Sequence, residues 1–406
     1  MKSIRNKLAI ATCTVLSQGV QQAAATESAW TTDTSYLLYS EADDRVTVHK
    51  IITRADVALG DHDQLSLEAV YDTVTGATPT GAVKSINTVS VTTPSSGGNG
   101  FKTASGSPDL VQFDDTRLGV NVGWTHDYTR TLAVSYGASV SVERDYEAYG
   151  GSITVNKETE DRNLAFTAGI AGSYDTIFQS SGGTPKPLGN VEENSGNPEF
   201  FGAGNKRGLE GMLGVSRVIN RRTVARINYS VKSLDGYLTD PYKLISRTDA
   251  NGIEMERYFE SRPDSRLRQS IYGILVHQLE NKDVVHVSYR YYWDDWGINS
   301  HTIDYRHRRN LFDGRFWEPH LRLYHQTAAD FFHHSLKYGE PLPQYASADY
   351  RLDEMSSITV GAKYGLPAWG GTLRFRLEYL YQSFAEAEYD TNKALIFQAS
   401  YKKEFD

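Results

Sequence analysis

The stretch Thr372–Phe384, TLRFRLEYLYQSF, alternates between apolar and polar side chains with a single exception, Leu380. A β-strand sends successive side chains to opposite faces, so this stretch has one apolar and one charged face. A packed soluble core rarely tolerates such a charged face, whereas a membrane β-barrel needs apolar residues toward lipid and polar residues toward its lumen. The apolar face carries Leu373, Phe375, Leu377, Tyr379 and Tyr381, and the charged face carries Arg374, Arg376, Glu378 and Gln382.

The same alternation recurs along the chain, for example in 132–143, 164–174, 285–294 and 395–405. Many such strands in series, with no helical run between them, indicate an all-β protein. After the N-terminus no apolar run approaches the ~20 residues that a membrane helix needs. The chain is rich in tyrosine, with 26 Tyr against 15 Phe and 6 Trp, and amphipathic rings suit the aromatic girdles of a membrane barrel.

The first 25 residues are typical of a secretory signal peptide. Lys2, Arg5 and Lys7 precede a short apolar core, and Ala23–Ala25 offers a small-residue cleavage site. Their removal takes three basic groups and no acidic group, which changes the formal net charge from −8 to −11. Such an acidic chain is a poor nucleic-acid binder. The only cysteine, Cys13, lies in this segment, so disulfides and thiolate sites are not expected in residues 26–406.

Turn residues divide the remaining chain into about 16 strands, an even number as bacterial barrels require. Short connections follow the even-numbered strands, and the long connections, near 76–113, 179–204, 236–266 and 329–354, all follow odd-numbered strands. We therefore predict a single transmembrane antiparallel β-barrel with short periplasmic turns and long extracellular loops. Its strands are expected to begin near Trp30, Arg45, Asp63, Asp114, Arg130, Asp145, Asp161, Asn205, Arg222, Leu267, Asp283, Asn299, Arg315, Met355, Gly370 and Lys393.

Several sequence runs resemble a bacterial outer-membrane family catalogued as domain of unknown function 3570. They include Gly76–Ala82, Leu238–Lys243, Tyr289–Gly297 and Tyr345–Leu352, and the resemblance covers essentially residues 26–406. It implies an outer-membrane barrel of a Gram-negative bacterium with no established activity. It also raises the alternative of a barrel that serves a periplasmic redox partner.

Basic residues share the parity of lumen-facing positions on neighbouring strands. We predict a lumen lined by Arg226, Arg290, Arg306, Arg308, Arg322, Arg374, Arg376 and Glu378. One interpretation is a charged path that selects permeating ions. The favoured interpretation is a network of ion pairs across neighbouring strands that holds the wall together.

The best functional hypothesis is passive passage of a small solute or ion, and the alternative is a non-conducting scaffold or receptor. No enzymatic activity is expected, because there is no G-x-S-x-G elbow and no mature cysteine. No cofactor or metal is predicted. Asp43–Asp44, Asp114–Asp115 and Asp294–Asp295 are interpreted as solvated turn residues, with Ca²⁺ as the alternative. The expected partners are outer-membrane lipid, lipopolysaccharide and the barrel-assembly machinery.

Overall fold

The computed structural model describes residues 30–43, 45–83, 110–177, 183–191, 200–201 and 204–405. The predicted signal peptide lies outside the described residues, and so does much of the predicted loop 76–113. Within the described part, no helix is long and apolar enough to cross a membrane.

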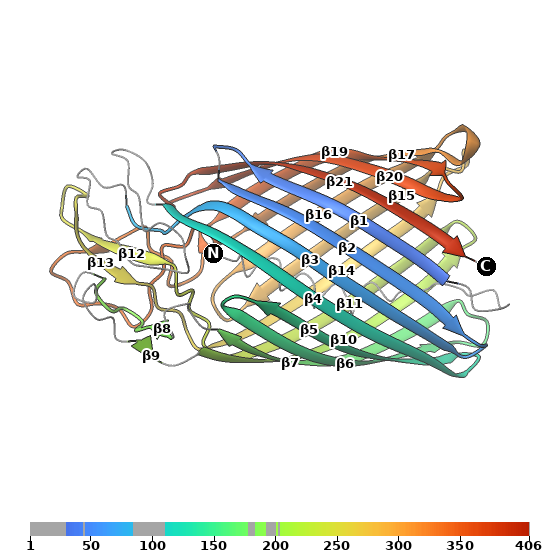
Figure 1. Cartoon of the computed structure of the whole chain (residues 1–406), viewed down its shortest axis with the longest axis horizontal. Coiled ribbons are helices and arrows are strands. Elements are labelled where there is room, and N and C mark those ends of the chain that lie inside the picture. Colours follow the sequence, from blue (N-terminus) through green and yellow to red (C-terminus); the bar gives the residue numbers. More distant parts are fainter. Residues whose placement is uncertain are drawn as a thin grey trace.

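Sixteen strands form a closed antiparallel barrel in the order β1-β2-β3-β4-β5-β6-β7-β10-β11-β14-β15-β16-β17-β19-β20-β21 (Figure 1). Pairing of β1 with β21, with Tyr36 opposite Ala399, closes the wall. The wall strands are β1 (Trp30–Glu41), β2 (Val46–Leu59), β3 (Asp63–Pro79), β4 (Leu110–Thr129), β5 (Leu132–Glu143), β6 (Tyr146–Glu158), β7 (Leu164–Ile177), β10 (Gly204–Asn220), β11 (Thr223–Gly236), β14 (Ser265–Gln278), β15 (Val284–Asp294), β16 (Asn299–Asn310), β17 (Phe316–Gln326), β19 (Met355–Ala368), β20 (Gly371–Phe384) and β21 (Thr391–Phe405).

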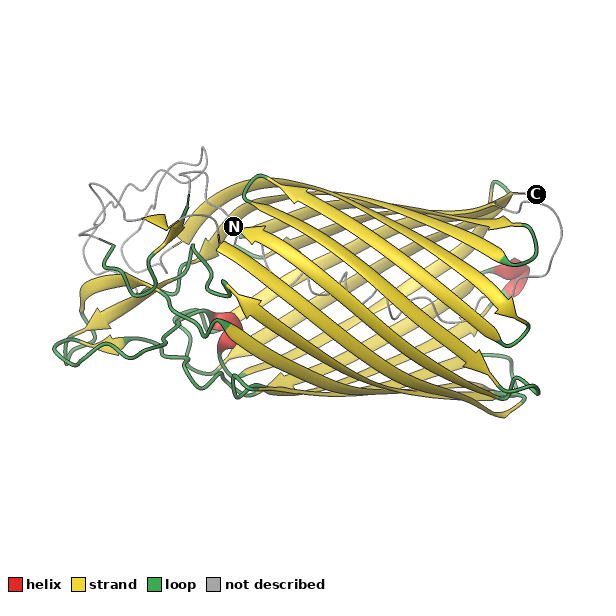
Figure 2. Cartoon of the chain, turned by 90° about the horizontal axis from the view of Figure 1, so that it is seen from below, coloured by secondary structure: helices red, strands yellow, loops and turns green. Residues whose placement is uncertain are grey.

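The predicted barrel and its strand number are confirmed. Trp30, Asp63, Asn299 and Met355 begin strands as expected, and the largest error is at β4, which begins at Leu110 rather than near Asp114. The two ends of the barrel differ as predicted (Figure 2). Tight turns such as 60–62, 221–222 and 369–370 close the periplasmic end. The described parts of the long connections, 80–83, 183–191, 237–264 and 327–354, lie at the extracellular end.

The long loops carry secondary structure of their own, which the sequence did not predict. A three-stranded sheet in the order β13-β12-β18 joins the loop after β11 to the loop after β17. The short elements are β8 (Thr184–Pro185), β9 (Phe200–Phe201), β12 (Leu244–Thr248), β13 (Glu254–Phe259), β18 (Leu336–Lys337) and the 3-10 helices η1 (Phe312–Gly314) and η2 (Tyr350–Leu352).

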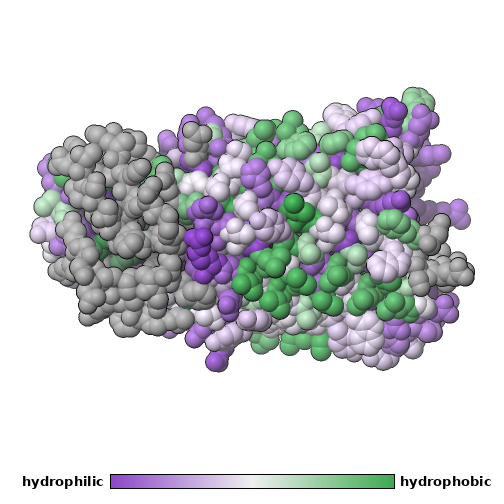
Figure 3. Space-filling model, viewed as in Figure 1, coloured by the Kyte–Doolittle hydropathy of each residue, from purple (hydrophilic) through white to green (hydrophobic). Residues whose placement is uncertain are grey.

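On the face of the molecule seen in Figure 3, apolar side chains gather over the middle of the barrel, and hydrophilic residues lie to either side of them along the barrel. Leu67, Leu118, Val120 and Val122 belong to the exposed apolar residues of this wall. In a hydrocarbon environment every backbone polar group must find a partner within the protein, and a closed barrel meets that need. The chain is therefore an outer-membrane β-barrel.

Candidate functional site

The two faces of the wall have opposite chemistry. On β20, Leu377 is 54% exposed while its neighbour Glu378 is 5% exposed. Phe375 and Tyr379 share the outer face with Leu377. The polar residues that alternate with this outer row therefore face the interior.

A chain of ion pairs crosses the inner wall from β16 to β20. The His320 imidazole lies between two carboxylates, with Nε2 2.8 Å from Asp304 Oδ2 and Nδ1 2.8 Å from Glu378 Oε1. Arg306 Nε is 3.1 Å from Asp304 Oδ1, and Arg376 Nη1 is 3.7 Å from Glu378 Oε1. Cations thus flank both ends of a carboxylate–imidazole–carboxylate bridge.

Gly361 makes this bridge sterically feasible. It lies on β19 between the two bridged strands, directly opposite His320 on one side and Glu378 on the other. A Cβ at position 361 would lie 2.5 Å from Glu378 Cγ and 2.3 Å from Leu377 O. The absence of a side chain lets His320 on β17 reach across the intervening strand.

A second set of ion pairs lines the opposite part of the wall, toward the extracellular end. Arg117 Nη2 is 2.6 Å from Asp72 Oδ2, and Lys50 Nζ is 3.6 Å from the same atom. Lys206 Nζ is 2.8 Å from Asp175 Oδ2. Opposite charges on neighbouring strands stabilise the pairing of those strands.

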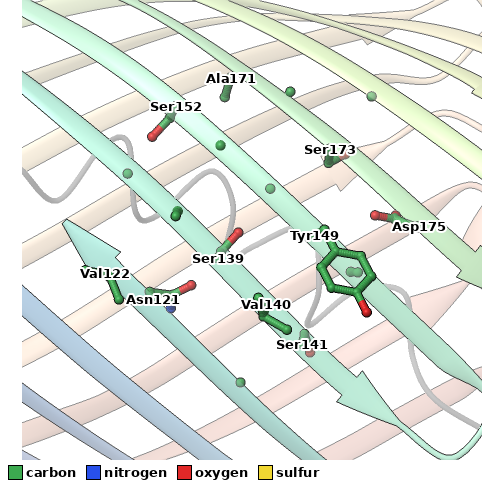
Figure 4. Close-up of a pocket in the computed structure, with 18 of the residues that line it drawn as sticks. Asn121, Val122, Ser139, Val140, Ser141, Tyr149, Ser152, Ala171, Ser173 and Asp175 are labelled. Carbon is green, nitrogen blue, oxygen red and sulfur yellow. The ribbon is translucent and has the colours of Figure 1, made fainter.

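Small and hydroxylated side chains surround an interior cavity of about 180 Å³ along β4 to β7. Figure 4 shows Asn121, Ser139, Ser152, Ser173 and Asp175 on these neighbouring strands. Lys206, Glu210 and Lys232 extend the lining of this cavity onto β10 and β11. The inner wall there presents hydroxyl groups and charges of both signs, so it suits polar contents.

The extracellular mouth is crossed by loop segments, which we call the cap and define as residues 80–83, 183–191, 237–264 and 327–354. Leu244 N donates to Thr80 O at 2.9 Å, although β3 and β11, from which these segments emerge, are separated by five strands. Val191 N donates to Arg257 O at 2.9 Å. Residues Lys243 to Ser246 are almost entirely buried, so the cap is a packed layer.

An apolar cluster packs the cap onto the rim of the barrel. Its buried members from the wall side are Leu234, Trp296 and Ile298, and those from the cap include Phe331 and Phe332. The Trp296 and Phe331 rings meet edge to face at 5.1 Å. Burial of these rings holds the loops on the barrel.

Six charged residues join the two longest cap segments. Asp240, Lys243, Glu260 and Asp349 are buried, and Arg262 and Arg351 are largely so. Arg351 bridges Asp240 and Asp349, with its Nη2 2.7 Å from Asp240 Oδ2 and its Nε 2.8 Å from Asp349 Oδ1. Arg262 Nη2 lies 2.8 Å from Asp349 Oδ2. Three carboxylates and three cations balance, which is the condition for burying charges at all.

The electrostatics of this cluster follow from burial and from the guanidinium groups. Burial alone would raise the pKa of Asp349, but Arg351, Lys243 and Arg262 outweigh it and hold that pKa far below its usual value. The pKa of Asp240 is lowered in the same way, against burial, chiefly by Arg351 and Arg262. Burial raises the pKa of Glu260 and lowers the pKa of Lys243 to about 8.

The comparison with protein families is decisive for classification. The model of the family described as "Protein of unknown function (DUF3570)" matches residues 5–397. The chain belongs to this family. No curated protein matches the chain.

Among solved structures, a bacterial polysaccharide outer membrane secretin is similar to this DUF3570 barrel with 9% identity and a TM-score of 0.47, over 93% of this chain and 98% of that chain. The outer membrane protein opdK from Pseudomonas aeruginosa gives 7% identity and a TM-score of 0.41, over 93% and 99%. A variant of the ferric enterobactin receptor from the same species gives 8% identity and a TM-score of 0.44, over 90% of this chain but 54% of that chain. These similarities carry no information about a solute or ligand.

The eight predicted lumen residues of the DUF3570 barrel occupy different surroundings. Arg306, Arg376 and Glu378 meet through His320. Arg374 Nη2 lies 2.5 Å from Asp33 Oδ1, and Arg226 Nε donates to Ser216 Oγ at 2.8 Å. Arg308 and Arg290 lie over the rings of Phe316 and Tyr292, and Arg322 is exposed. The prediction missed His320, although its alternation with Leu321 and Leu323 places it on the inner face.

The interpretation of the acidic doublets as solvated turns was wrong for two of them. The Asp294 side chain is fully buried and accepts a 2.8 Å hydrogen bond from Arg266 Nε. Asp115 is buried and groups with Glu143 and Asp145, whose carboxylate oxygens lie within 4.8 Å of one another. Tyr242 in the cap donates to Asp145 Oδ2 at 2.8 Å, so this acidic group also contacts the cap.

Proposed function

We propose that this outer-membrane barrel lets a small polar solute or ion pass through its lumen. The observation that carries the proposal is the exposure of charged side chains on the inner face. The Arg306 side chain is 46% exposed, although Tyr305 beside it points to the outer surface. Arg322, opposite Asp304 on the next strand, is exposed as well.

An inward-pointing guanidinium is exposed only where the interior leaves room for water. A barrel of about 16 strands has an interior wider than side chains alone can fill. Water and small polar molecules therefore have space beside Arg306 and Arg322. The packed cap across the mouth restricts entry to small solutes.

A liposome-swelling assay tests the proposal. Full-length protein is refolded into liposomes loaded with dextran, and swelling is followed in isotonic solutions of a pentose, a disaccharide and a trisaccharide. We expect entry of the pentose and slower entry as size increases. Equal rates for protein-containing and empty liposomes, with folding confirmed by heat-dependent gel mobility, would reject passage of neutral solutes of this size.

The alternative proposal is a non-conducting scaffold or receptor, and the buried ionic cluster of the cap favours it. A network that fixes the loops across the mouth also builds a rigid extracellular surface. Failure of all three sugars to enter, together with the absence of ionic current, would make this alternative the better account. A periplasmic partner, including a redox protein, is a separate proposal that co-purification tests.

A further inference from the structure

Four charged residues lie side by side on the inner wall, in direct register across four strands. Glu210 on β10 faces Lys232 on β11, Lys232 faces Arg268 on β14, and Arg268 faces Asp294 on β15. Their neighbours Leu209 and Leu267 are exposed on the outer face. The two central positions of the row are both cations.

Neither acid of the row forms an ion pair with Arg268: Glu210 pairs with Lys232, and Asp294 is hydrogen-bonded to other residues. Glu210 Oε2 lies 3.3 Å from Lys232 Nζ. Asp294 accepts hydrogen bonds from Arg266 Nε at 2.8 Å, from Tyr292 OH at 2.6 Å and from Trp296 N at 3.1 Å. The carboxylate of Asp294 thus finds its hydrogen-bond donors at the rim of the barrel and not in Arg268.

Arg268 makes no direct ion pair among the residues that the structure describes, although the charges of Asp294 and Glu210 act on it from nearby. No hydrogen bond or ion pair joins its guanidinium to any of them, and its buried Nε and Nη1 have no hydrogen-bond partner there. Buried donors without partners cost free energy, and like charges directly opposite each other destabilise a strand pair. A bound anion would remove both costs.

The place of this pair in the barrel gives an anion a route to it. Lys232 lines the interior cavity together with Glu210 and Lys206. The next inward-facing pair toward the extracellular end is Leu234 opposite Arg266, and Leu234 belongs to the apolar cluster under the cap. The Lys232–Arg268 pair therefore lies where the cavity meets the underside of the cap.

We propose that Lys232 and Arg268 form a binding site for a small solute that carries a carboxylate or phosphate group. The planar guanidinium offers two parallel N–H donors to two oxygens of such a group, and the Lys232 ammonium adds a third donor. The inference rests on the proposed passage only for the route by which the solute arrives. The site would make that solute an anion.

Equilibrium binding tests the site independently of conduction. Titration calorimetry on the folded full-length protein in detergent uses inorganic phosphate and acetate as probes, at constant ionic strength. We expect Arg268→Gln to weaken phosphate binding by about tenfold or more, because it removes a charge-assisted hydrogen-bonding pair. Arg268→Lys should bind phosphate more weakly than the unchanged protein and more tightly than Arg268→Gln. Arg222→Gln, at an exposed periplasmic turn, should bind as the unchanged protein does.

The melting temperature separates binding from a structural role. Because Arg268 gives up no partner among the described residues, Arg268→Gln should not lower the melting temperature, whereas a wall-stabilising arginine would. If that variant fails to fold, Lys232→Gln must show the loss of phosphate binding instead. Absence of phosphate and acetate binding to the unchanged protein, or equal binding to the variants, would overturn the site.

The two proposals fail in distinguishable ways. Binding of phosphate by a protein that admits no sugar and carries no current would keep the site and reject passage. Passage without binding of either probe would keep the channel and reject the site.

Discussion

Arg351 Nη2 lies 2.7 Å from Asp240 Oδ2, and this contact joins two loops whose residues are 111 positions apart in the sequence. The same guanidinium holds Asp349. Both carboxylates are buried, so one arginine neutralises charge from both of the longest cap segments. The cap is therefore fixed by an ion pair between its two longest segments as well as by its apolar base.

Arg351→Gln should loosen the cap without opening the wall. It leaves Asp240 and Asp349 short of a cation in a buried setting, which costs about 3–5 kcal/mol. Limited proteolysis of the folded protein should cleave within 237–264 or 327–354 much faster than in the unchanged protein, while heat-dependent gel mobility persists. Lys337→Gln, on an exposed cap strand, is the matched control and should change nothing. Equal cleavage of both variants would contradict the role of Arg351.

Acid should loosen the cap in a defined pH range. The pKa values of Asp240 and Asp349 are lowered in the folded state, where Arg351 and other cations outweigh burial. The stabilisation is therefore complete above the ordinary aspartate pKa of about 4 and is lost progressively as the pH falls from there toward the lowered folded-state pKa values. Glu260 acts in the opposite sense, because burial raises its pKa and protonation then relieves a cost.

Glu260 acts only above its ordinary pKa, because below it the group is protonated in both the folded and the unfolded state. Below about pH 4 the two aspartates therefore set the direction, which is a loss of cap stability. Near-UV circular dichroism should report lost aromatic packing there, while the far-UV strand signal persists. In Arg351→Gln the loss should begin at higher pH, because the aspartate pKa values rise. A near-UV signal that is constant down to pH 2 would argue against a cap held by these carboxylates.

The sequence predicted the wall well and the cap poorly, for a physical reason. Lipid on one side and a polar interior on the other impose a period of two, which Leu377 and Glu378 display in adjacent positions. Asp240 and Asp349 follow no period, since their burial depends on partners brought together only by the fold. A charged residue in a polar loop is normally solvated, so Asp294 was also misjudged. The alternation that places Arg322 on the inner face also places His320 there, so His320 could have been predicted.

Gly236 should resist substitution more strongly than Gly252. Both have positive φ, at 113° and 78°, which costs an L-residue about 1–2 kcal/mol. A Cβ at Gly236 would also lie 2.1 Å from Asn205 O, whereas one at Gly252 meets nothing within 4 Å. In urea unfolding, Gly236→Ala should therefore lose clearly more stability than Gly252→Ala. Equal losses would contradict the close approach of Gly236 to the Asn205 carbonyl at the end of β11.

Leu377→Arg should destabilise the barrel more than Arg376→Leu. Leu377 is exposed on the outer face, and an arginine near the bilayer midplane costs about 2–4 kcal/mol. Arg376→Leu removes one 3.7 Å ion pair from Glu378, which keeps His320 at 2.8 Å. The efficiency of folding into liposomes measures the effect of each substitution. The reverse order would place the strand one residue out of register.

Single-channel recording in a planar bilayer tests the central claim, passage through the lumen, most directly. The unchanged protein should give discrete current steps, and Arg322→Glu should shift selectivity toward cations, because a fixed charge beside the path sets ion preference. Arg130→Glu, at an exposed periplasmic turn, should leave selectivity unchanged. A silent bilayer containing protein whose folding is verified by heat-dependent gel mobility would contradict the account and leave the capped scaffold in its place.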